Sequence, residues 1–313
     1  MSKRFAWLAL PAAFFISTYA SAATKSFTAA QASLPADTEI VATSNLKSVR
    51  SSQTFQKLFP QLLKLDKEAP DMLAKVKKSC GFDPVTAIDD VTLGVAKDEE
   101  GAFFVAVNGV TEQKLVDCAT KLAKSEGKET ITAKKTGNIT ELKSDKGGSP
   151  IFFAWLPDNV LVIASEPEEK ATLEKMLGGK GALAKSKVGA RLGKIHDDAA
   201  VSVVFSKELP VDSMTVKGGD FTLAVKSGVV DIVTTLEMAS NKEAEQLVTA
   251  AKAIGSLLPL PKDAPKEVEK ILKSVDGKAS GAEATITASA AEKDLIAVVN
   301  WATGLTKTKA VAR

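Results

Sequence analysis

Aromatic residues are scarce in this chain. Its 313 residues include thirteen Phe, three Trp and one Tyr. The single tyrosine, Tyr19, lies near the N-terminus, and beyond residue 22 the only tryptophans are Trp155 and Trp301. Tyr and Trp are the usual anchors of protein interfaces. We therefore expect a core of Ala, Val, Leu and Ile, and neither a large aromatic binding surface nor a carbohydrate site built on aromatic platforms.

Histidine is almost absent as well. His196 is the only one, so a Ser-His-Asp triad or a His-containing zinc site would have to use it. It lies in a polar stretch, 194–198, where a solvated or capping role is expected. No Gly-x-Ser-x-Gly motif occurs, and Gly189–Gly193 has one residue too few between its glycines for a phosphate-binding loop. The sequence predicts no catalytic residue, no metal ligand and no cofactor.

Neither sign of charge dominates. The chain has 41 Lys and Arg residues against 38 Asp and Glu, and without Lys3 and Arg4 the basic count falls to 41 − 2 = 39. A nearly neutral chain has no field that attracts nucleic acid or an anionic membrane. Beyond residue 22 no apolar run reaches the about 18 residues of a membrane span. We expect no nucleic-acid partner and no membrane span, and the sequence does not indicate the oligomeric state.

Residues 1–22 have the pattern of a cleavable signal peptide. Lys3 and Arg4 precede an apolar run, Phe5–Ile16, and Ala20-Ser21-Ala22 is a cleavage site of small residues. The apolar run is shorter than the about 20 residues that span a bilayer, which favours cleavage over retention as an anchor. We expect export to the periplasm or beyond the cell, and a mature chain of 313 − 22 = 291 residues.

Two cysteines, Cys80 and Cys118, remain in the predicted mature chain. Both fall in segments with helical periodicity, on either side of one predicted hairpin. Disulfides form in oxidising compartments, so we expect these cysteines to be joined. Two buried free thiols acting as small apolar side chains are the alternative. A redox pair is disfavoured because the spacing is far from Cys-x-x-Cys.

Alternating helical and strand patterns predict an α+β fold of two related halves, each with an antiparallel sheet and helices on one face. We expect a first half at 23–180, a linker at 181–196 that is rich in Gly, Ala and Lys, and a second half at 197–313. Strand pairs are predicted at 90–96 with 102–108, 129–134 with 138–143, 151–156 with 159–165, and 221–226 with 229–238. Each half follows a β-α-β-β-α-β order, with a loop in place of the first helix in the second half.

Short segments repeat between the halves. Val91–Lys97 (VTLGVAK) is similar to Phe221–Ser227 (FTLAVKS), and each opens a predicted hairpin followed by a helix. Leu161–Ser165 (LVIAS) is similar to Thr285–Ser289 (TITAS), and each strand runs into a helix. Because the matches occur in the same order in both halves, we expect an internal duplication. Generic strand and helix alternation is the alternative.

Two short motifs flank the first predicted strands. They are Leu34-Pro35-Ala36-Asp37-Thr38, and Gly81-Phe82-Asp83-Pro84 followed by Ile88-Asp89. In these motifs the chain resembles a group of uncharacterised exported bacterial proteins. The resemblance implies an extracytoplasmic α+β protein and carries no activity or site residues.

Three functions remain open from the sequence. The first is an exported, non-catalytic binding or assembly module with a protein or envelope component as its partner. The second is a hydrolase that acts on envelope material with carboxylates and lysines alone. The third is an inhibitor or chaperone-like module that captures peptides on a sheet edge. The missing catalytic motifs favour a module that is not an enzyme.

Overall fold

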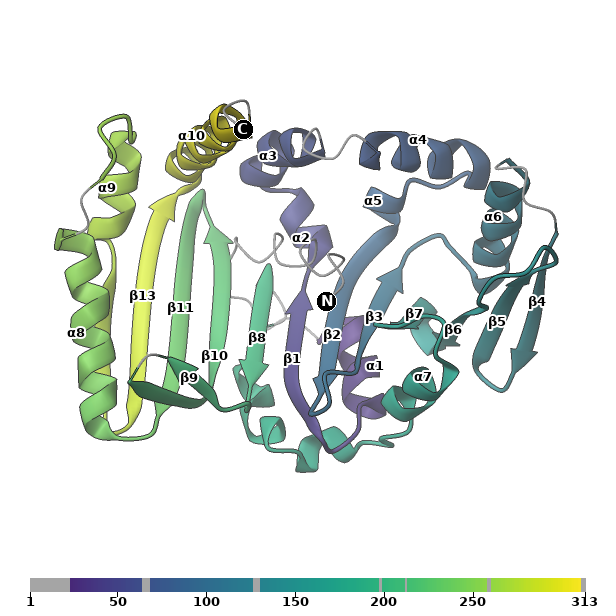
Figure 1. The fold of residues 1–313 in the computed structure, drawn as a ribbon, viewed down its shortest axis with the longest axis horizontal. Coiled ribbons are helices and arrows are strands. Elements are labelled where there is room, and N and C mark those ends of the chain that lie inside the picture. Colours follow the sequence, from purple (N-terminus) through teal and green to yellow (C-terminus); the bar gives the residue numbers. More distant parts are fainter. Residues whose placement is uncertain are drawn as a thin grey trace. The chain divides into compact units, whose positions relative to one another are not determined.

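The computed structural model describes residues 23–63, 68–125, 130–196, 199–211, 213–257 and 260–310. They form two compact units (Figure 1). The first unit contains residues 23–47 and 62–193, and the second contains 48–61 and 194–310. The predicted signal peptide, 1–22, lies outside the described residues. The predicted α+β class is confirmed, because both units combine helices with antiparallel sheet.

The first unit has a sheet of order β1-β2-β3-β7-β6-β5-β4, in which all neighbours are antiparallel. The strands are β1 (Thr38–Ser44), β2 (Ile88–Ala96), β3 (Gly101–Val107), β4 (Ile131–Thr136), β5 (Ile139–Ser144), β6 (Ile151–Leu156) and β7 (Val160–Ala164). The three predicted hairpins of this half are present. In β3 and β7 buried residues follow one another along the strand. Because neighbouring side chains point to opposite faces, both faces of the sheet must be covered by other elements here.

Helices cover both faces of this sheet. They are α1 (Lys25–Ser33), α4 (Ala69–Cys80), α5 (Pro84–Ala87), α6 (Glu112–Ser125) and α7 (Lys170–Leu177). Helix α1 lies on the face of Thr92 and Gly94, where Ser26 and Leu34 contact them. Helix α6 lies on the opposite face, because its Glu112 accepts a hydrogen bond from Thr140. The expectation that all helices share one face is therefore wrong for this unit.

The segment predicted as a linker, 181–196, folds into two 3-10 helices, Ala182–Lys185 and Val188–Lys194. Leu183 and Val188 in these turns are fully buried. The Gly, Ala and Lys composition predicted a linker, but the segment is folded and contains these two buried apolar side chains. The first of these turns packs against α1.

The second unit has a sheet of order β8-β10-β11-β13-β12, and the short strand β9 pairs with β10. Its strands are β8 (Val201–Phe205), β9 (Leu209–Val211), β10 (Met214–Lys226), β11 (Val229–Met238), β12 (Asp276–Ser280) and β13 (Glu283–Ala291). The helices of the later chain are α8 (Asn241–Leu257), α9 (Lys266–Lys273) and α10 (Glu292–Ala310), while α2 (Leu46–Arg50) and α3 (Gln53–Leu63) lie where the chain passes between the units.

Helices α8 and α10 pack on one face of this second sheet. Val248 of α8 contacts the cluster around Met238 of β11, and Leu295 of α10 packs against Val230 of the same strand. Met238 and Val230 lie an even number of positions apart in β11, so their side chains point to the same face. In this unit the predicted one-sided arrangement therefore holds for these two helices.

The repeated segments occupy corresponding strands. Val91–Lys97 lies in or next to β2 and Phe221–Ser227 in or next to β10, while the second pair of repeats lies in β7 and β13. In the first sheet β2 pairs with β3 and β3 with β7. In the second sheet β10 pairs with β11 and β11 with β13. This shared pairing order supports an internal duplication, which stays a prediction.

Candidate binding surface at strand β4

The described residues show no cluster that suits catalysis through metal or imidazole. Among them, no group of three or more His, Cys, Asp or Glu residues is arranged to hold a metal ion. His196 is exposed, and its backbone N–H donates to the Ser202 hydroxyl. It stands at a chain turn before β8, where a polar side chain is expected.

The predicted disulfide between Cys80 and Cys118 is present, with a Cα–Cα distance of 4.7 Å. It joins the last residue of α4 to the middle of α6. Cys118 is buried and the two helices pack along each other. The disulfide thus fixes α6 against α4, and α6 in turn contacts strand β4 of the first sheet.

A buried hydrogen bond joins helix α1 to strand β2. Asp90 of β2 is buried, and its carboxylate accepts a 2.8 Å hydrogen bond from the backbone N–H of Ser26. Thr24, the residue before the helix, makes no capping hydrogen bond of its own. Asp90 therefore satisfies an N–H group of the first turn that the helix itself cannot satisfy. The hydroxyls of Ser26 and Thr92, 2.8 Å apart, extend this buried network.

Replacing Asp90 by Ala should therefore destabilise the first unit. The change leaves a buried N–H group of Ser26 without its acceptor, which costs about 1–3 kcal/mol. Urea unfolding followed by circular dichroism measures the loss. Asp145→Ala is the matched control, since Asp145 is exposed and should stay within about 0.5 kcal/mol of wild type. Equal unfolding midpoints for the two variants would show that Asp90 does not cap α1.

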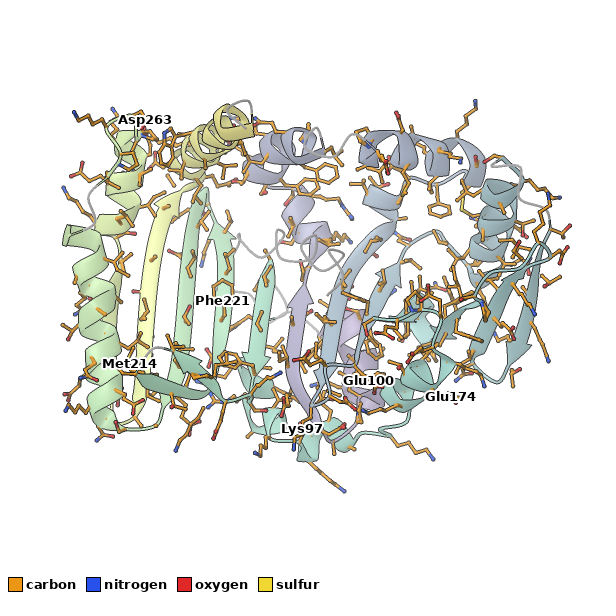
Figure 2. The ribbon with its side chains drawn as sticks, in the orientation of Figure 1. Lys97, Glu100, Glu174, Met214, Phe221 and Asp263 are labelled. Atoms are coloured by element: carbon orange, nitrogen blue, oxygen red, sulfur yellow. A yellow bond between two sulfur atoms is a disulfide. The ribbon has the colours of Figure 1, made fainter. Side chains whose placement is uncertain are left out.

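A cluster of charged side chains in the first unit surrounds Lys175 of α7. Its ammonium lies 2.5 Å from Asp98 and 2.7 Å from Glu100, at the tip of the β2–β3 hairpin, and 3.6 Å from Asp37. Hydrogen bonds to Asp98 and Glu100 raise the pKa of Lys175 well above its usual range. Figure 2 labels Glu100 at this tip. The cluster connects α7 to the tip of the β2–β3 hairpin. A lysine whose pKa is raised by carboxylates stays protonated and does not act as a base.

Strand β4 lies at one end of the first sheet and has a single strand neighbour, β5 (Figure 1). Five of its six residues, Thr132–Thr136, are exposed although they form regular strand. A strand in this position presents backbone N–H and C=O groups that are not paired within the sheet. β4 is therefore a template on which a further strand can be added.

The β4–β5 register shows which of these groups point outward. The N–H of Asp145 donates to the C=O of Thr130, so this opposed pair is hydrogen-bonded. Hydrogen-bonded and non-hydrogen-bonded pairs alternate along an antiparallel ladder. With Thr132 opposite Lys143 and Lys134 opposite Glu141, the inward-bonded residues are Thr132 and Lys134. The backbone groups of Ile131, Ala133 and Lys135 therefore point away from β5.

The other short or terminal strands are less suited to strand addition. Strand β9 has three residues and includes Pro210, which has no N–H to donate. In β12 exposed residues alternate with half-buried ones, and Ala279 packs against the cluster that contains α8 residues. Over the described ranges, neither strand offers a run of exposed residues like that of β4.

Glu112 at the start of α6 holds the hairpin in place. Its carboxylate lies 2.5 Å from the Lys135 ammonium and accepts a 2.6 Å hydrogen bond from the Thr140 hydroxyl. Burial raises the pKa of Glu112, but the hydrogen bonds from Lys135 and Thr140 outweigh it, so the pKa lies below its usual range. A lowered pKa stabilises the fold above the ordinary pKa, and this contribution is lost as the pH falls through the folded-state value. The stabilising contribution of Glu112 is therefore present at neutral pH.

The charged residues of β4 are both lysines. Lys134 and Lys135 lie on opposite faces of the strand, and β4 has no acidic residue. The sequence predicted the hairpin, but β4 was not singled out as an end strand. The available signal was the polar character of both faces, which is typical of strands at a sheet edge.

No known protein family matches the chain, and no curated protein matches it. A structure titled "Structure of crystal form I of TP0453" is similar to this chain with a TM-score of 0.44 at 10% sequence identity. The match covers 86% of this chain and 95% of that chain.

Proposed function

We propose that this chain is an exported, non-catalytic binding module that takes up an extended segment of a partner protein at β4. The partner's segment pairs with the outward backbone groups of Ile131, Ala133 and Lys135 and adds a strand to the first sheet. The single observation that carries the proposal is the exposed run Thr132–Thr136 in a strand with one neighbour. Main-chain hydrogen bonds then supply affinity, and the side chains beside them supply specificity.

Export to the periplasm or beyond the cell is part of this proposal. The signal-peptide pattern of residues 1–22 supports it. The disulfide of Cys80 with Cys118 agrees with an oxidising compartment. Within the described residues no helix is long and apolar enough to cross a membrane.

Rigidity of the hairpin supports a binding role over a purely structural one. The disulfide fixes α6 against α4, and Glu112 of α6 bonds Lys135 of β4 and Thr140 of β5. A pre-organised edge loses less conformational entropy when a partner strand docks. The same contacts hold the strand in the extended conformation in which the backbone N–H and C=O groups of Ile131, Ala133 and Lys135 point away from β5.

A proline substitution at Ala133, the middle of the three residues whose backbone groups point away from β5, tests whether a peptide binds there. Ala133→Pro removes an N–H that points away from β5, so the hairpin is retained while strand addition loses a hydrogen bond and meets the proline ring. Binding of a fluorescent seven-residue peptide of alternating Val and Thr is measured by anisotropy. Loss of one hydrogen bond, about 0.5–1.5 kcal/mol, together with the ring clash should weaken binding about tenfold.

Ala133→Ser is the matched control, because it keeps both the N–H and a small side chain, so its binding should stay much closer to wild type than that of Ala133→Pro. Circular dichroism melting checks that both variants fold. A folded Ala133→Pro variant that binds the peptide with wild-type affinity, or a wild-type protein that does not bind it, would contradict the proposed function.

A further inference from the structure

The neighbours of β4 divide the docking surface into two different faces. Thr132 and Lys134 share a face with Lys143 and Glu141 of β5, which lie opposite them. Ala133 lies on the other face, opposite the half-buried Leu142. An added strand would place successive residues on these two faces in turn, since side chains alternate along a strand.

The face of Lys134 is basic. Lys134 and Lys143 are both exposed. Glu141 lies directly opposite Lys134 and offsets one of these two charges, so the face has one positive charge in excess. An antiparallel strand added to β4 would meet Thr132 and Lys134 in non-hydrogen-bonded positions, where opposed side chains lie closest, with Cα atoms about 4.5 Å apart. A carboxylate opposite Lys134 would therefore lie within reach of its ammonium.

The face of Ala133 favours small or branched apolar residues. Ala133 leaves room beside Leu142, and Ile131 at the start of the strand is half-buried. Lys135 on this face is already paired with Glu112, so its charge is largely neutralised. An apolar side chain opposite Ala133 would cover Leu142 and gain from leaving water.

A second copy of this chain is a poor occupant. Pairing β4 with another β4 would bring two copies of Lys134 and Lys135 to one junction, with no acidic residue on either strand. Like charges that face each other across a sheet are destabilising. Edge lysines commonly prevent such self-association.

Resting on the proposed function, we infer that the partner is an extended acidic segment that alternates carboxylate and apolar residues. Its carboxylates lie on the face of Lys134 and Lys143, and its apolar residues lie over Ala133 and Leu142. The edge thus rejects basic strands and copies of itself, and accepts acidic ones.

Three seven-residue peptides test this, in which valine alternates with glutamate, with lysine or with threonine. Wild-type protein should bind the Val/Glu peptide at least about tenfold more tightly than the Val/Lys peptide, with Val/Thr between them. Lys134→Glu should reverse the preference, while Lys146→Glu, a change at an exposed lysine beyond the strand, should leave it unchanged. Salt should weaken binding of the Val/Glu peptide more than that of Val/Thr.

The outcomes separate the two proposals. Equal binding of all three peptides, blocked by Ala133→Pro, leaves strand addition standing and overturns the acidic partner. A preference for Val/Glu that Lys134→Glu does not change also overturns it. If none of the peptides binds, both the acidic partner and strand addition at β4 are wrong.

Discussion

Removal of the disulfide should lower the free energy of unfolding of the first unit by about 4 kcal/mol. Cys80 and Cys118 are 38 positions apart, and the chain-entropy model gives this value for a closed loop of about 39 residues. Typical domains are stable by about 5–15 kcal/mol, so the loss is a large part of the total. The double variant Cys80→Ala/Cys118→Ala should show it in urea unfolding.

Two controls accompany this variant. Reductant should destabilise the wild-type protein and leave the double variant unaffected, because the variant has no disulfide to reduce. Hydrogen exchange should increase most in α4 and α6, while the second unit, which contains no cysteine, changes less. A double variant with the wild-type unfolding midpoint would show that the disulfide does not stabilise the fold.

Replacing Gly179 by Ala should destabilise the first unit by about 3 kcal/mol, at the upper end of the usual cost of overpacking. Gly179 follows α7, and its N–H donates a 2.8 Å hydrogen bond to the C=O of Ser33 at the end of α1. A Cβ at this position would lie 1.9 Å from the backbone oxygen of Leu34. Backbone cannot move aside as a flexible side chain can, so α1 and α7 would have to separate.

Gly193→Ala is the matched control for this change. A Cβ added at Gly193 meets nothing within 4 Å, so this variant should be neutral or slightly stabilised through loss of entropy in the unfolded chain. Thermal unfolding of both variants gives the comparison. Similar melting temperatures for the two would contradict the close approach of α1 and α7.

The elements with strong local signals were predictable from sequence. Apolar runs and the turn residues between them located the hairpins, including Ile151–Leu156 with Val160–Ala164. Helical periodicity located α6 and α8, and the cysteine count with the predicted export led to the disulfide. The hairpins and helices depend on residues that are close together in the chain. The disulfide was predictable because two cysteines allow only one intramolecular pair.

Features that depend on tertiary contacts were missed. Helix α1 has no strong local signal, because its buried residues Ser26, Phe27 and Ala30 form no clear apolar stripe, and its first turn is capped from β2 by Asp90, 64 residues away. Pro60 lies inside α3, where a proline usually breaks a helix. Pro60 and Gln56, whose carbonyl loses its partner there, are both exposed, so water can satisfy the freed group.

The binding edge could be predicted only in part. The sequence pairs 129–134 with 138–143, and one hypothesis from sequence was peptide capture on a sheet edge. Which strand lies at an edge depends on the order of the whole sheet, and that order is set by long-range pairs such as Phe103 with Ile163 across β3 and β7. The disulfide residues, by contrast, were the one pair of site residues named from sequence.

Amide hydrogen exchange along β4, resolved by residue with NMR, tests strand addition most directly. In the free protein, Ala133 and Lys135 should exchange at least about tenfold faster than Thr132 and Lys134, whose N–H groups bond to β5. Saturating Val/Glu peptide should slow exchange at Ala133 and Lys135 and leave Thr132 and Lys134 unchanged. Exchange at Ala133 and Lys135 that is already slow in the free protein, or that the bound peptide does not slow, would contradict a partner strand at this edge.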